Sequence, residues 1–133
     1  MQDSPLSQYL LLFRGTDWPL ELSPAATEEI MNRANAWFEG LFNAGKALGA
    51  QPLGAAGATV SWRNGTISDG PFVESKESVG GYLMLAVDSF DEAMAIARQN
   101  PLIPYGLQVE VRPISDECPL VRRVMENAAA AHV

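Results

Sequence analysis

Histidine and cysteine are almost missing from the sequence, with one of each among 133 residues, His132 and Cys118. A lone cysteine cannot form an internal disulfide, and it excludes a zinc site of the finger type. The sequence also lacks a glycine-rich phosphate loop, a Ser-His-Asp set and metal-ligand spacing. We therefore predict no metal and no cofactor.

Positive charge is also scarce, because 9 lysines and arginines stand against 16 acidic residues, for a net charge of -7. Binding to nucleic acid or to an anionic membrane surface requires a basic face, so we predict neither partner. The longest apolar run, residues 9–13, is far below the ~20 residues of a membrane span. The N-terminus has no basic stretch ahead of an apolar one, so we expect no secretory signal and a cytoplasmic location.

What is present is typical of a globular protein, with 47% hydrophobic and 19% charged residues. The length suits one domain with a real core. We predict a single domain over residues 1–133, with its core in residues 8–114.

Periodicity and turn residues predict the strands. Residues 8–15 form a short apolar run ended by glycine, and residues 46–54 are a weaker candidate. Asn64 and Gly65 are the pair that a type I′ turn requires, so residues 58–63 and 66–68 are expected to form a hairpin. Residues 81–89 read as a central strand buried on both faces, and residues 107–113 alternate most regularly.

Cap residues predict the helices. Ser23 followed by Pro24 begins a helix over residues 24–44. Ser89 and Glu92 form a capping box, in which each side chain would bond the backbone amide of the other, and that helix should end at Asn100 because proline follows. A C-terminal helix is expected over residues 118–131.

The order of these elements predicts an α+β fold, a ferredoxin-like βαββαβ sandwich with an inserted β-hairpin and a C-terminal helix. Both long helices would cover one face of a four-stranded antiparallel sheet. The other face needs a cover, and only a short helix remains for it. We therefore predict a homodimer with the two sheets packed face to face, a dimeric α/β barrel.

Four motifs occur in one order: D-G-P-F from Asp69, E-x-K-E from Glu74, G-G-Y ending at Tyr82, and E-V-R-P from Glu110. Together with "YLLLFRG" from Tyr9, this combination resembles the YCII-related family, in the branch named for D-G-P-F. The resemblance spans residues 9–114. It implies dimeric α+β barrels of ferredoxin-like halves, for which most members of the branch have no assigned activity.

The resemblance also implies two wider possibilities. Many members of the branch are encoded beside extracytoplasmic-function sigma factors, which suggests a regulatory protein partner. Some members of the wider family are lyases or dehydrochlorinases that use a His-Asp pair on small aromatic or lactone-like molecules. This sequence departs from that pattern, because its only histidine is penultimate and residues 28–42 contain none.

Asp69 is the best catalytic candidate, either as a base or ligand contact at the mouth of a cleft or as a carboxylate that caps its own turn. Phe72 is expected to anchor the loop in the core. Three charged residues that follow it either rim a pocket or pair with one another on the surface: Glu74, Lys76 and Glu77.

Arg14 and Arg112 close two strands expected at the same end of the sheet. They either hold a carboxylate or phosphate, or form ion pairs with Glu110, Glu74 or Glu77. Trp37 and Tyr82 point toward the core by periodicity, with pocket lining as the alternative. Cys118 has no histidine to activate it and is a poor nucleophile.

The favoured hypothesis is a homodimer that binds a small molecule, with anions among the candidates, in a cleft between the sheet, the helix over residues 24–44 and the loop from Asp69 to Gly81. The first alternative is an enzyme, a lyase or isomerase that uses Asp69 as base on a small organic acid or lactone. The second is a protein-interaction module linked to a sigma-factor system. The lack of a usable histidine favours binding over catalysis.

Overall fold

The computed structural model describes residues 7–15, 22–54, 56–71 and 79–131. Its elements are, in order, β1 (Ser7–Arg14), α1 (Pro24–Asn43), β2 (Ala47–Pro52), β3 (Ala58–Arg63), β4 (Thr66–Pro71), β5 (Val79–Val87), α2 (Phe90–Arg98), a 3₁₀ turn (Ile103–Tyr105), β6 (Gln108–Pro113) and α3 (Pro119–Ala131). One antiparallel sheet has the order β2-β5-β1-β6, and β3 and β4 form a separate two-stranded ladder. This is the predicted ferredoxin-like topology with its inserted hairpin.

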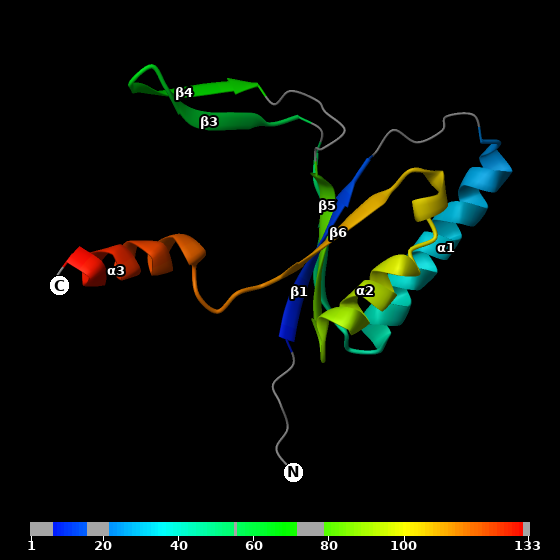
Figure 1. Ribbon diagram of the computed structural model, residues 1–133. Helices are drawn as coiled ribbons and strands as arrows, with labels where there is room; N and C mark the ends of the chain where they lie inside the picture. Colours follow the sequence, from blue (N-terminus) through cyan, green and yellow to red (C-terminus); the bar gives the residue numbers. More distant parts are fainter. Residues whose placement is uncertain (1–6, 16–21, 55, 72–78, 132–133) are drawn as a thin grey trace, which may run out of the picture.

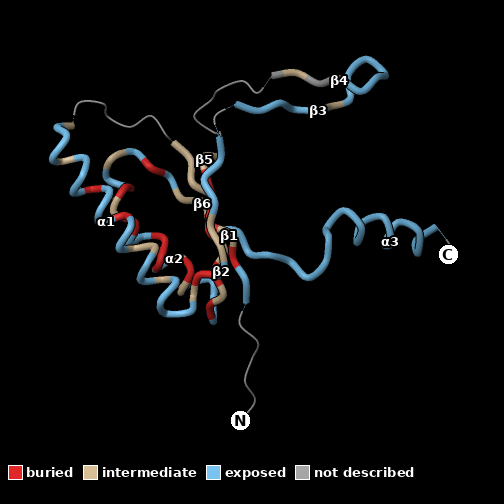
Figure 2. The backbone as a smooth tube through the Cα atoms, turned by 180° about the vertical axis from the view of Figure 1, so that it is seen from behind, coloured by how far each residue is buried: buried red, intermediate tan, exposed pale blue. Residues whose placement is uncertain are grey.

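Helices α1 and α2 lie together on one face of the four-stranded sheet (Figure 1). The core forms between them and the alternate residues of the central strands, where Leu11, Leu83 and Leu85 have no exposed surface. In Figure 2 the buried segments gather where these helices meet the sheet. Burial of apolar side chains on this one face therefore holds the domain together.

Both long helices begin at the predicted serines. The hydroxyl of Ser23 accepts from the N–H of Ala26, and that of Ser89 accepts from the N–H of Glu92. The second half of the predicted capping box differs, because the Glu92 carboxylate accepts from the N–H of Asp88, one residue before the cap. Its other oxygen lies 3.1 Å from Nζ of Lys46, which holds it toward β2. Helix α2 ends at Arg98, two residues earlier than expected.

The glycine pair at the start of β5, Gly80 and Gly81, forms a bulge and allows a close approach of two backbones. Phe13 pairs with Gly81 and Arg14 pairs with Val79, so Gly80 is the extra residue of a bulge. A Cβ on Gly81 would lie 3.1 Å from the carbonyl oxygen of Gln51, so the two backbones approach closely there. A side chain at position 81 would therefore require β2 to shift slightly away from β5.

The hairpin turns at Asn64 and Gly65, both with positive φ (51° and 78°), as a type I′ turn requires. Strand β4 is longer than predicted, because it continues to Pro71 instead of ending at residue 68. The reason is that β3 offers ladder partners along its whole length, with Val60 opposite Asp69 and Ala58 opposite Pro71. Asp69 therefore lies in a strand and not in the connecting loop.

The second face of the sheet is not covered by α3. That helix and the β3–β4 hairpin project on the side away from α1 and α2, in both views (Figures 1 and 2). No residue of α3 is buried. Among the described helices, none has the length and apolar character needed to cross a bilayer.

Candidate functional site

The face of the sheet opposite α1 and α2, called the open face here, carries the alternate residues of its strands. Two apolar side chains of β1 and two side chains of β5 form its centre, and all four are partly exposed: Leu10, Leu12, Tyr82 and Met84. One row crosses all four strands, since Tyr82 pairs with Gln51 on one side and with Leu12 on the other, and Leu12 pairs with Glu110. The open face is thus apolar in the middle and polar at its β6 edge.

Two arginines meet one carboxylate at that edge. Nε of Arg14 donates to Oε1 of Glu110 at 3.1 Å, and Nη1 of Arg112 donates to Oε2 of the same residue at 3.2 Å. These ion pairs are one of the two alternatives that the sequence left open for Arg14 and Arg112. Among the described residues, these two guanidinium groups share the one carboxylate of Glu110.

The electrostatics of the cluster keep Glu110 ionised. The hydrogen bond from Arg112 lowers the pKa of Glu110 most, and the bond from Arg14 lowers it further, while partial desolvation acts in the opposite direction. Side-chain exposure differs between the two cations, at 24% for Arg14 and 67% for Arg112. Arg14 is therefore held against the sheet, and Arg112 presents its guanidinium to solvent.

The cluster lies at the end of the sheet from which the hairpin departs. Arg14 is opposite Val79, the residue at which the described chain resumes in β5. Of the predicted site residues, the structure thus brings Arg14, Tyr82 and Arg112 to one face and one region. Glu110 belongs to the same site. Its position two residues before Arg112 in an alternating strand already indicated that the two side chains share a face.

Trp37 lies on the other side of the sheet. Its Nε1 donates to the carbonyl oxygen of Ile96 at 3.2 Å, and its ring makes edge-to-face contacts with Phe13 and Phe38. The sheet separates it from the arginines, so the structure does not bring Trp37 into one pocket with them. Tyr82, expected to point to the core, lies instead on the open face.

The remaining sequence candidates belong to the hairpin and the loop after it. Asp69 is described by its backbone alone, on a hairpin that projects on the side of the sheet opposite α1 (Figure 1). The described elements therefore do not form the expected cleft between that helix and the segment carrying Asp69. Phe72, Glu74, Lys76 and Glu77 lie outside the described residues.

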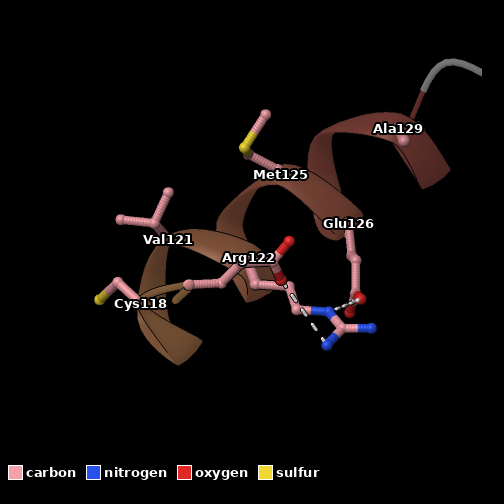
Figure 3. Close-up of a pocket in the computed structure, with 7 residues that line it drawn as sticks. Cys118, Val121, Arg122, Met125, Glu126 and Ala129 are labelled. Carbon is pink, nitrogen blue, oxygen red and sulfur yellow. Dashed lines mark hydrogen bonds and ion pairs between the residues drawn. The ribbon is translucent and has the colours of Figure 1, made fainter. Parts of the chain in front are cut away.

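A separate hollow of about 650 Å³ runs along α3 (Figure 3), and its lining consists of Glu117, Cys118, Val121, Arg122, Met125, Glu126 and Ala129. All of these belong to the helix or to the two residues before it, so the hollow is a helix face and not an enclosed cavity.

The N–H groups of Val121 and Leu120 lower the pKa of the exposed Cys118 thiol. Within the described part of the chain, no group of acidic, histidine or cysteine side chains has the arrangement of a metal site.

The antiparallel order β2-β5-β1-β6 with two helices on one face defines a ferredoxin-like α+β protein. The YCII-related domain matches residues 8–117 of the chain. The chain therefore belongs to the YCII-related family, as its motifs indicated.

Among solved structures, the chain is similar to 5-chloro-2-hydroxyhydroquinone dehydrochlorinase (TftG) from Burkholderia phenoliruptrix AC1100, determined in complex with 2,5-dihydroxybenzoquinone. The two chains are 17% identical, the match covers 83% of this chain and 95% of that one, and the TM-score is 0.43. None of the curated proteins matches the sequence significantly.

Proposed function

We propose that this protein is a homodimer that binds a small anionic molecule on the open face, at the cluster of Arg14, Glu110 and Arg112. The observation that carries the proposal is that the carboxylate of Glu110 holds the guanidinium groups of Arg14 and Arg112 side by side, with that of Arg112 turned to solvent. A guanidinium has five N–H donors in a planar fork that matches a carboxylate or phosphate. Arg112 is 67% exposed, so an incoming anion can reach it without unfolding the sheet.

The surroundings of the cluster favour a small organic anion over a bare inorganic one. Leu12 and Tyr82 lie in the same row of the sheet as Glu110 and offer an apolar surface and a phenol group. Sites for small molecules combine such apolar lining with a few polar groups that fix orientation. The region also adjoins the start of β5, in agreement with the sequence-based expectation of a site beside the loop that ends at Gly81.

The homodimer is supported by the same face. Leu10, Leu12, Tyr82 and Met84 form an apolar centre that is only partly exposed, while the helices cover the other face. Two sheets pack face to face at about 10 Å with their inner side chains interdigitated. A second copy placed in this way would remove the apolar centre from water and would leave the charged β6 edge at the border of the contact.

The test is titration of the protein with a panel of small mono- and dicarboxylates and with inorganic phosphate, followed by calorimetry and by the arginine side-chain NMR signals. Arg112→Gln should weaken binding about tenfold or more, because a hydrogen bond to a charged group contributes about 1.5–3 kcal/mol. Glu110→Gln should strengthen binding, since it removes the carboxylate that competes for both arginines.

Arg123→Gln is the matched control, because Arg123 is an exposed arginine on α3, away from the sheet. It removes the same charge and should leave affinity unchanged within about twofold, as expected for screened surface charges. Equal loss of binding in Arg112→Gln and Arg123→Gln would show a general charge effect and would contradict a site at the cluster.

A further inference from the structure

Helix α3 has one apolar face that the described part of the chain leaves exposed. Four large side chains on that face are 55% to 69% exposed: Leu120, Val121, Val124 and Met125. The opposite side carries Arg122, whose Nε lies 3.1 Å from Glu126 Oε1 and whose Nη1 lies 3.8 Å from Glu117 Oε2 (Figure 3). Helices of this length are marginal in water unless an amphipathic face packs against something. The helix therefore needs a partner surface.

The β3–β4 hairpin has the same property. Val60, Trp62 and Ile67 fall on one face, because Trp62 and Ile67 are directly paired and Val60 is two residues from Trp62. Their exposed fractions are 67%, 69% and 73%. The other face carries Thr59, Ser61 and Thr66. An isolated two-stranded hairpin is marginally stable at best in water, so the apolar face of this one also needs a cover.

Both elements extend on the side of the open face, away from α1 and α2, and the two opposite views agree on this (Figures 1 and 2). We call the hairpin (residues 58–71) and α3 (residues 119–131) the two arms. Three uncovered apolar surfaces, the open face and one face of each arm, thus belong to the same side of the molecule. A partner that covers them must offer a broad apolar surface on that side.

We infer that both arms pack on a second copy of this chain, reciprocally, so that each copy is held between the hairpin and α3 of the other. This inference rests on the homodimer of the proposed function, and it assigns the surfaces that stabilise it. The seven large apolar side chains of the arms, at roughly 100 Å² of exposed area each, reach on the order of the ~800 Å² per partner that a standard stable interface buries. The arms alone thus supply the area that a stable dimer needs.

A second copy fits better than an unrelated partner for a reason of symmetry. In a two-fold contact the same surface is used twice, so the arms of both copies and both open faces are covered in a single step. An unrelated protein would have to offer separate complements for a sheet face, a hairpin face and a helix face. The polar sides of the arms, such as Thr59 and Glu126, would stay in water in the two-fold contact.

Sedimentation velocity on the full chain over a range of concentrations tests whether the arms stabilise the dimer. Trp62→Glu and Val124→Glu place a charge on the apolar face of each arm, and each should raise the dimer dissociation constant about tenfold or more, as for central interface residues. The matched controls Thr59→Glu and Ala130→Glu add the same charge to the polar side of the same arms and should leave the constant unchanged. Equal effects of the two sets would overturn the inference.

Crosslinking tests whether the contacts run between copies. A photoreactive label on Cys118, the one cysteine of the sequence, lies at the start of α3. Protein labelled with ¹⁴N is mixed with protein labelled with ¹⁵N, and the subunits are allowed to exchange between dimers. The label is then activated, and the crosslinked peptides are identified by mass. We expect peptide pairs that carry both isotopes. A second placement, Ala130→Cys in a Cys118→Ser background, puts the label on the polar side of the helix, where it leaves the apolar face intact.

The outcomes separate the inference from the function on which it rests. A wild-type dimer whose crosslinks all lie within one isotope overturns arm exchange and leaves the homodimer standing. A wild-type protein that sediments as a 14.4 kDa monomer at every concentration overturns both. Association with a different protein in place of self-association would also overturn the inference. Anion binding at the Arg112 cluster is measured separately and is not changed by any of these results.

Discussion

At the scale of single residues, Glu110 shows how neighbours across a sheet decide a side chain's behaviour. It lies on β6 between Arg112 of the same strand and Arg14 of β1, and both donate to its carboxylate. The sequence places Arg112 beside it by simple alternation. Arg14 is 96 residues away along the chain, and only the pairing of β1 with β6 brings it within 3.1 Å.

This arrangement predicts that Glu110 titrates at a lower pH than an ordinary glutamate. The pKa of Glu110 is lowered in the folded state, chiefly by Arg112, so its ion pair with Arg112 stabilises the fold at pH values above the unfolded pKa. That contribution is lost as pH falls through the folded pKa, below the usual range of a glutamate. NMR titration of the Glu110 side-chain carboxyl should show the lowered value, and Arg112→Gln should move it back toward the usual one. An unchanged titration in the variant would mean that Arg112 does not contact Glu110.

At the scale of elements, the boundaries of the helices follow from local chemistry, and their neighbours adjust the details. Ser23 and Ser89 cap α1 and α2 as predicted from their hydroxyls and the residues that follow. The Glu92 carboxylate, however, is shared between the N–H of Asp88 and the ammonium of Lys46. Lys46, the residue just before β2, thus helps to place the start of α2.

The cap of α2 gives an element-scale prediction. Ser89→Ala removes the acceptor for the N–H of Glu92, and loss of such a cap costs about 0.5–2 kcal/mol of protein stability. Urea denaturation should show a lower midpoint with an unchanged slope. Ser89→Asp keeps an acceptor at the position and should retain most of the stability. Equal destabilisation by both substitutions would point to packing and not to the cap.

At the scale of the whole molecule, net charge and apolar surface have opposite effects on the association of two copies. Each copy of the chain has a net charge of -7, so two copies repel each other at long range, while in the proposed dimer the apolar faces of the arms favour association. The proposed anion site depends on attraction, since a negative ligand would bind the guanidinium groups of Arg14 and Arg112.

Salt should therefore change the two equilibria in opposite senses. Raising ionic strength shortens the Debye length, to about 10 Å at 0.1 M, and screens repulsion between copies, so the dimer should tighten severalfold. The same change should weaken binding of a small anion to the arginine cluster. Sedimentation and calorimetry at two salt concentrations measure both effects. A dimer that loosens with salt would show that attractive charge pairs, and not the apolar arms, hold it together.

The sequence by itself determined the order of the elements, the ferredoxin-like topology, the type I′ turn at Asn64 and Gly65, and the family. These depend on local signals, such as caps, alternation and glycine positions, that act within a few residues. Tertiary structure decided that β4 runs on to Pro71, because its ladder partners lie on β3. It also decided which candidates share a face, with Arg14, Tyr82 and Arg112 on one side of the sheet and Trp37 on the other. Pairing between distant strands sets those positions, and no local pattern contains it.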